Sequence, residues 1–128
     1  MKVTAAIFRD KDKDLLMRRA SDQPLAGTWE YPGGKFEEGE DGPACLHREL
    51  HEELGIDAKV GELVIIAKHT TESGKVIELH AYEIEHYTGD IQLRVHDKMH
   101  WVPLSELLSH PQLPADKIVS QKLVTMEK

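Results

Sequence analysis

The sequence predicts a layered α/β or α+β domain, and three observations support this prediction. Short apolar runs typical of strands alternate with helical patterns, the clearest helix lies between groups of strands, and hydrophobic residues make up 40% of the chain. Strands and helices in such an arrangement pack as layers around a common core. Because a domain takes roughly 100 to 200 residues, we expect a single domain over residues 1–128.

Two strands and a long loop make up the N-terminal third. The apolar runs Val3–Phe8 and Leu15–Arg18 are separated by a charged segment, which predicts a strand, a turn and a strand. From Ser21 to Gly42, repeated prolines and glycines interrupt every regular pattern and indicate a loop. A loop of this length in a small domain usually carries a function.

A helix follows this loop. Asp41 or Gly42 serves as its N-cap, Pro43 stands in the first turn, and Gly55 ends it. Residues four apart form the predicted buried stripe, which consists of Leu46, Leu50 and Leu54. Another face carries three carboxylates, those of Glu49, Glu52 and Glu53.

The remaining chain predicts three strands and two helices. Two segments rich in Val, Ile, Leu and Tyr predict antiparallel strands joined by a hairpin turn at 72–75, and they are Ala58–Thr70 and Val76–Tyr87. The elements expected after them are a strand at Met99–Val102, a short helix at Leu104–Leu108 and a closing helix at Ala115–Met126.

The negative charge of the chain is concentrated in one segment. The net charge is -7, and residues 37–53 hold seven acidic side chains against one basic side chain, or -6. Such a segment repels nucleic-acid backbones, so binding to a duplex is not expected. The first apolar run is too short for a signal peptide or a membrane span, and Cys45 is the only cysteine. We therefore expect a cytoplasmic protein that binds neither nucleic-acid duplex nor membrane.

Three carboxylates on one helix face need an explanation, because like charges at this spacing destabilise a helix. One interpretation is a solvated surface that Arg48 partly neutralises. The other is a divalent cation, since Mg²⁺ takes oxygen ligands and is commonly held by one or two carboxylates together with substrate phosphates. The helix alone does not decide between them, and the preceding loop supplies the context.

That loop carries a pattern of fixed spacing. Its paired glycines, Gly33 and Gly34, allow a sharp turn and a close approach of the backbone to a ligand. Five residues separate Gly34 from Glu40, and seven more separate Glu40 from Arg48–Ile56, whose sequence is RELHEELGI. This matches the Nudix box throughout, and nearly the whole chain resembles the Nudix hydrolases, in particular their MutT-like nucleoside triphosphate pyrophosphohydrolases. The resemblance favours the cation over the solvated surface.

The resemblance implies a fold, a reaction and a set of site residues. The fold is a Nudix-type α/β/α sandwich with a mixed β-sheet. The reaction is metal-dependent hydrolysis of (deoxy)nucleoside triphosphates, including oxidised or modified ones, to nucleoside monophosphate and pyrophosphate. The groups implied to bind Mg²⁺ or Mn²⁺ are the carboxylates of Glu49, Glu52 and Glu53 and the carbonyl of Gly33. Arg48 would orient Glu49, which would help to bind the metal or deprotonate the attacking water, and Glu40 would support this network.

One position departs from the family pattern. MutT-like enzymes often carry a further glutamate six residues before a late tryptophan, and counting back from Trp101 gives Val95. Either Asp97 supplies the missing oxygen ligand, or Glu49 carries more of the work. We favour the second interpretation.

The candidates for substrate binding come from several segments: Arg19, Tyr31, Gly34, Lys35, Leu79 and Asp116. By resemblance, Asp116 stands where the family contacts the base, and it is similar to relatives that accept cytidine or modified pyrimidine nucleotides. Its other interpretation is a plain helix N-cap. Tyr31 and Trp29 flank the glycine loop, where the alternative to substrate contact is core packing, which we favour for Trp29.

Two further functions stay open. The segment after the box lacks the proline and the tyrosine that mark ADP-ribose and dinucleoside polyphosphate hydrolases, which favours triphosphates. Hydrolysis of another diphosphate-linked nucleoside is the second enzymatic hypothesis. A nucleotide-sensing module without turnover is the third, and the intact glutamates argue against it. The expected partner is a small nucleotide, and the expected state is a monomer or a homodimer.

Overall fold

The computed structural model describes residues 1–126, so the last two residues of the predicted domain, 127–128, lie outside the described residues. The strands are β1 (Lys2–Ile7), β2 (Arg9–Asp10), β3 (Lys13–Arg19), β4 (Trp29–Glu30), β5 (Asp57–Thr70), β6 (Val76–Thr88) and β7 (His96–Pro103). The helices are α1 (Gly42–Leu54), the short 3₁₀ helix η1 (Leu104–Ser109) and α2 (Pro114–Met126). The predicted α+β class is confirmed, although β7 begins at His96 rather than at Met99.

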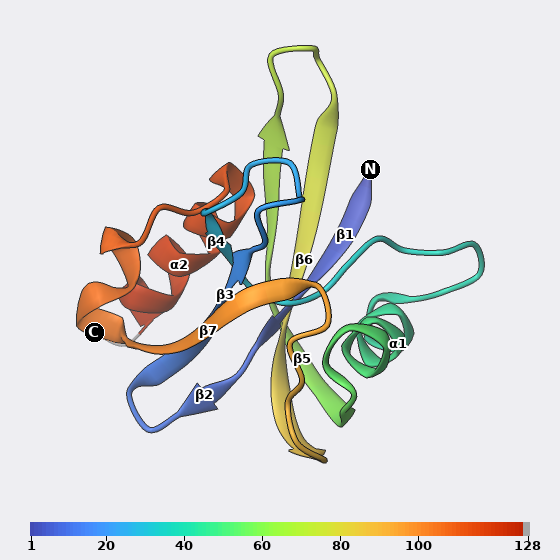
Figure 1. The fold of residues 1–128 in the computed structure, drawn as a ribbon. Helices are drawn as coiled ribbons and strands as arrows, with labels where there is room; N and C mark the ends of the chain where they lie inside the picture. Colours follow the sequence, from blue (N-terminus) through green and yellow to red (C-terminus); the bar gives the residue numbers. More distant parts are fainter. Residues whose placement is uncertain (127–128) are drawn as a thin grey trace.

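The strands form two sheets (Figure 1). The first has the order β1-β6-β5 and is mixed, because β1 runs parallel to β6 while β5 and β6 are antiparallel. The second is antiparallel throughout, with β3 paired to β2, β4 and β7. The mixed sheet that the resemblance implies is therefore formed by β1, β6 and β5. The other four strands form a separate sheet.

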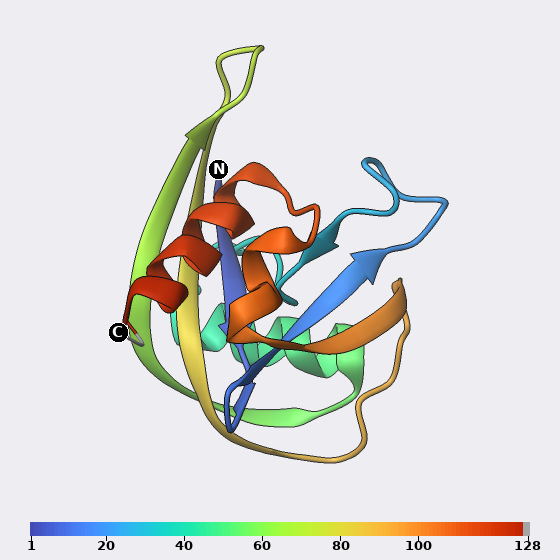
Figure 2. The same cartoon turned by 90° about the vertical axis from the view of Figure 1, so that its left-hand side faces the viewer.

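Strand β1 is buried on both faces, which explains why its sequence is a continuous apolar run. Ala5 and Ile7 belong to one buried cluster, and Ala6 and Phe8 belong to another, because successive side chains point to opposite faces. Helix α2 packs on the first cluster and α1 on the second. Figures 1 and 2 show β1 passing between the two helices, which confirms the α/β/α layering.

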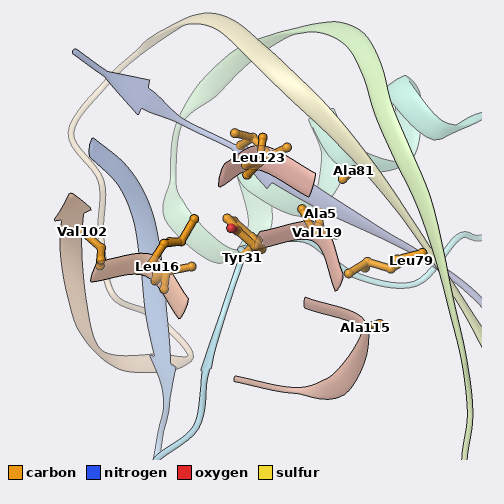
Figure 3. Packing of buried hydrophobic residues seen from close by; sticks show 12 residues of the cluster. Ala5, Leu16, Tyr31, Leu79, Ala81, Val102, Ala115, Val119 and Leu123 are labelled. Atoms are coloured by element: carbon orange, nitrogen blue, oxygen red, sulfur yellow. The ribbon is translucent and has the colours of Figure 1, made fainter. Parts of the chain in front are cut away.

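The cluster on the α2 side joins the two sheets. Its side chains come from β1, β3, β5, β6, β7, η1 and α2, and the ring of Tyr31 lies among them (Figure 3). Trp29 is partly buried and packs against the same cluster, and its ring stands edge-on to His110 with 5.4 Å between the ring centroids. The core interpretation of Trp29 is confirmed.

Helix α1 has the ends that its sequence predicts. The Asp41 side chain accepts a hydrogen bond from the Ala44 backbone N–H at 2.8 Å, and Gly55 closes the helix in the left-handed conformation with φ of 71°. The stripe of Leu46, Leu50 and Leu54 is fully buried. Among residues 1–126, no helix has the length and apolar character needed to traverse a bilayer.

Candidate active site

The glycine loop is fastened to β1. The Thr4 backbone N–H donates to the Gly34 carbonyl at 2.8 Å, and the Ala6 N–H donates to the Pro32 carbonyl at 2.7 Å. A methyl group on Gly33 would collide with the Thr4 carbonyl, so only glycine lets the loop lie this close to the strand. The loop is thereby fixed between β1 and α1, on the side of the mixed sheet that α1 covers (Figure 1).

The second glycine lets the loop approach a carboxylate of α1. A Cβ atom on Gly34 would occupy the position of the Glu49 carboxylate group. The fixed sequence spacing between Gly34 and Glu49 therefore corresponds to a direct contact between these two residues. This contact puts the backbone of the loop and the carboxylates of α1 against one cavity, which Gly33, Gly34, Glu49 and Glu53 help to line.

Arg48 organises the carboxylates at the edge of this cavity. Its Nε and Nη2 atoms donate to the two oxygens of Glu40 at 2.7 and 2.9 Å. Its Nη1 atom donates to Glu49 Oε1 at 2.9 Å and to Glu52 Oε2 at 3.2 Å. The hydrogen bonds from Arg48 and from the Glu37 backbone N–H hold the pKa of Glu40 low, at about 2. Arg48 therefore fixes Glu49 in place, and Glu40 fixes Arg48.

Glu53 is the carboxylate that the fold leaves unsatisfied. Its Oε2 atom is buried without a hydrogen-bond partner among the described residues. Burial, followed by the nearby charges of Glu49 and Glu30, raises the pKa of Glu53 to about 8, against the stabilising hydrogen bond from the Gly33 backbone. A buried carboxylate oxygen next to another carboxylate is an electrostatic arrangement that a bound cation would satisfy.

The predicted trio of glutamates is divided. Glu49 and Glu53 line the cavity, but the Glu52 side chain is 57% exposed and is held by Arg48. Within residues 1–126, no three His, Cys, Asp or Glu side chains come close enough together to hold a metal ion. The protein offers the cavity two carboxylates and the backbone of Gly33, and Glu52 joins them only if its side chain leaves Arg48.

The cavity has a volume of about 680 Å³, within the range of small-molecule sites. The predicted residues that line it are Arg19, Tyr31, Gly33, Gly34, Lys35, Glu49, Glu53, Leu79 and Asp116. Those outside the lining are Glu40, Arg48 and Glu52. Residues predicted from distant segments of the sequence thus line one cavity.

Asp116 is one of these lining residues. Helix α2 begins at Pro114, so Asp116 lies within the first turn, and its interpretation as a plain N-cap is wrong. The residue is 5% exposed, and Oδ2 accepts a long hydrogen bond of 3.4 Å from the Tyr31 N–H. Burial, followed by the charge of Glu30, raises the pKa of Asp116 well above its usual range. Asp116 consequently lines the cavity in surroundings that favour its neutral form.

Tyr31 contributes to the cavity without offering a stacking surface. Its side chain belongs to the core (Figure 3), with an exposure of 3%. Its hydroxyl lies 2.7 Å from that of Ser120. The expectation that Tyr31 contacts substrate is thus limited to the atoms near its backbone. Its ring is part of the hydrophobic core, as the alternative interpretation expected.

Glu30 and His96 are among the cavity residues to which the sequence analysis gave no role. Arg19 Nη1 donates to Glu30 Oε1 at 2.9 Å, and His96 Nε2 lies 2.9 Å from Glu30 Oε2. Glu30 stands in a two-residue strand inside the glycine-rich segment, and His96 is one of eight scattered histidines. No local pattern marks either residue, because only the pairing of β3 with β4 and β7 brings them together.

Asp97 lies away from the cavity. It accepts two hydrogen bonds from Arg18, at 2.8 and 3.0 Å, whereas Val95 and His96 line the cavity. The Arg18 hydrogen bonds also hold the pKa of Asp97 below its usual range. This placement supports the interpretation that Asp97 does not replace the missing loop glutamate.

The chain belongs to the Nudix family, because the NUDIX domain matches residues 1–123. It is 43% identical over 117 residues to the CTP pyrophosphohydrolase of Escherichia coli strain K12, covering 91% of this chain and 85% of the relative. It is 30% identical over 125 residues to the 8-oxo-dGTP diphosphatase of Haemophilus influenzae, covering 97% and 91%.

Solved structures share the fold. The solution structure of the E. coli ORF135 protein has a TM-score of 0.88 and 37% identity, and covers 98% of this chain and 89% of that protein. The MutT NUDIX hydrolase from Burkholderia pseudomallei has a TM-score of 0.84 and 25% identity, and covers 95% and 96%. The two sheets and two main helices are therefore the Nudix fold.

Proposed function

We propose that this Nudix protein is a metal-dependent pyrophosphohydrolase of nucleoside triphosphates. It would convert a ribo- or deoxyribonucleoside triphosphate and water into the nucleoside monophosphate and pyrophosphate. The observation that carries the proposal is the unsatisfied Glu53 carboxylate, placed beside Glu49 and the glycine loop in a cavity of nucleotide size. The names of the two relatives, which specify CTP and 8-oxo-dGTP, support the same substrate class.

The residues present fit a divalent cation. Glu49, Glu53 and the Gly33 carbonyl would hold it, with Glu52 joining after its side chain leaves Arg48, and all are the hard oxygen donors that Mg²⁺ and Mn²⁺ prefer. When bound, the cation would neutralise the polyphosphate and stabilise charge on its oxygens. A buried oxygen without a partner is the structural reason to expect that ion at Glu53 rather than on the exposed Glu52.

Glu49 is the best-placed proton acceptor. Arg48 holds one of its oxygens at 2.9 Å, and the carboxylate lies against Gly34 at the cavity lining. In this proposal, Glu49 accepts a proton from the attacking water, whose oxygen bonds to phosphorus as the anhydride P–O bond breaks and pyrophosphate leaves. Arg48 and Glu40 act as positioning residues, since neither lines the cavity.

We expect the base to bind where Asp116 lines the cavity. In its neutral form, which burial favours, the Asp116 carboxyl can donate one hydrogen bond and accept another. Leu79 offers an apolar surface at the lining, and Lys35, exposed at the cavity edge, would attract the phosphates. Glu49, Glu53 and Asp116 line the same cavity, which supports a nucleotide as its ligand.

A nucleotide panel tests the proposal. The protein is incubated with canonical, oxidised and methylated triphosphates in Mg²⁺ or Mn²⁺, and the products are separated by chromatography. We expect monophosphate and pyrophosphate, and no turnover by Glu53→Gln. Binding without turnover by the wild type would favour the sensing hypothesis instead, and products other than pyrophosphate would indicate another diphosphate-linked substrate.

A further inference from the structure

Three strands each deliver one residue to a hydrogen-bonded group at the cavity lining. Arg19 ends β3, Glu30 ends β4 and His96 begins β7. The Glu30 carboxylate is held by Arg19 on one oxygen and by the His96 ring on the other, both at 2.9 Å. Arg19 is itself fixed, because its Nε donates to the Pro24 carbonyl at 2.7 Å.

A β-bulge aims His96 at this group. Along β3 and β7, Arg18 pairs with Lys98 but Arg19 pairs with His96, so Asp97 is left over. Such an extra residue re-aims neighbouring side chains, and bulges are frequent next to active sites. Here Asp97 points outward to Arg18, while His96 is 7% exposed and reaches Glu30.

The histidine is buried in an incompletely satisfied state. In the part of the chain that the structure describes, His96 Nδ1 is buried and has no hydrogen-bond partner. An unsatisfied buried nitrogen of this kind destabilises the folded state. A fold that needed only to fill this space would do better with an apolar side chain, so the Nε2 contact with Glu30 is the feature that accounts for the histidine.

The contacts define the hydrogen-bonding character of Glu30. The Arg19 guanidinium only donates, and a carboxylate bound to it accepts, so the His96 nitrogen that faces Glu30 carries a proton. The two donors, one on each oxygen, hold the carboxylate in one orientation. Its side chain is 17% exposed and lines the cavity, so a ligand there would meet it as a hydrogen-bond acceptor.

Glu30 and Asp116 therefore differ in what they recognise. Burial favours the neutral form of Asp116, which can pair with either a donor or an acceptor edge of a base. The Glu30 carboxylate, held by donors from Arg19 and His96, offers acceptors, so it attracts an amino group and repels a keto oxygen. The charge of Glu30 also raises the pKa of Asp116 and that of Glu53.

We propose that His96 is a positioning residue that, together with Arg19, holds Glu30 in place. Glu30 is then the specificity determinant: it selects bases that carry an exocyclic amino group over bases that carry a keto oxygen at the same position. Among the pyrimidine nucleotides this selects CTP over UTP, which share ribose and triphosphate and differ at that edge. The inference rests on the proposed function, because it concerns base recognition in the same cavity.

The test compares kcat and KM for CTP and UTP in the wild type and in variants. We expect the wild type to favour CTP, and His96→Leu to lower the CTP-to-UTP ratio of kcat/KM at least tenfold, mainly through a higher KM for CTP. His96→Gln should restore the ratio to within about threefold, since a glutamine amide places a donor where Nε2 stands, whereas His96→Asn should not. Glu30→Gln should level the ratio, because its amide can donate to the keto oxygen of UTP.

The controls separate this inference from a purely structural role. His100→Leu, on the same strand but outside the cavity lining, should leave the ratio unchanged. If the ratio is unchanged in folded, active His96→Leu and Glu30→Gln, or if the wild type does not favour CTP over UTP, the inference is wrong while the proposed function stands. If His96→Leu does not fold, Glu30→Gln decides alone. A wild type that hydrolyses no triphosphate overturns the proposed function and this inference with it.

Discussion

In metal-free protein, Glu53→Gln should stabilise the fold increasingly as the pH rises. The pKa of Glu53 is about 8 in the folded protein and 4.5 as its ordinary value. Between these two values the folded state holds a proton that the unfolded state has released. Stability therefore falls with rising pH through this window, and the loss is complete above the folded pKa. Glutamine has no proton to lose, so the variant escapes this loss.

The magnitude follows from the same shift. Moving a pKa from 4.5 to about 8 corresponds to at most about 5 kcal/mol. The side chain is only partly buried and shares its site with Glu49, so we expect screening to leave about 2 kcal/mol. For a chain of this length, that free energy corresponds to about 6 to 10 °C in Tm.

Thermal unfolding in EDTA at acidic, neutral and alkaline pH measures this effect. Tm of the variant minus Tm of the wild type should be near zero at about pH 4 and should reach its full value near pH 9. The matched control is Glu52→Gln, one residue earlier in α1, whose exposed side chain pairs with Arg48 and should give no such growth. A difference that is the same at both ends of the pH range would refute the reasoning that Glu53 is held protonated by burial.

Three other outcomes are expected. Asp97→Asn should lower kcat/KM less than tenfold, because Asp97 pairs with Arg18 outside the cavity, and an inactive variant in steady-state assays would contradict this placement. Gly34→Ala should lower kcat at least tenfold, because its methyl group displaces the Glu49 carboxylate; Gly74→Ala, strained at φ of 87° in the hairpin, should lose stability but keep kcat. Mg²⁺ or Mn²⁺ with nucleotide should raise Tm, since a ligand that binds only the folded state stabilises it. An unchanged Tm would indicate that the carboxylates are only solvated surface charges.

The elements with strong local signals could be predicted from the sequence. Helix α1 has an N-cap, a proline in its first turn, a terminal glycine and a leucine stripe, and the structure has each of these in its predicted role. The long strands β5 and β6 are likewise found within a residue of their predicted bounds. These features depend on residues close in sequence, whose spacing records the geometry of a helix or a strand.

The candidate site was only partly predictable. The spacing from Gly34 to Glu49 and Glu53 reflects a contact between a loop and the helix that follows it directly, so it is visible in the sequence. Glu30 and His96 lie far apart in the chain and show no pattern of their own. The contact between Glu30 and His96 depends on strand pairing and on a β-bulge, and no local sequence pattern predicts the position of that bulge.

The sequence by itself determined the Nudix box, the acidic character of α1 and the order of the elements, because each depends on short-range spacing. Only the tertiary structure decided how the three glutamates divide, with Glu53 buried at the cavity and Glu52 held outside by Arg48. It also decided that Asp116 is buried, with its pKa raised by that burial, rather than serving as a helix cap. The physical reason is that burial and the approach of distant charges set the protonation and orientation of an acid, and both arise only when the layers pack.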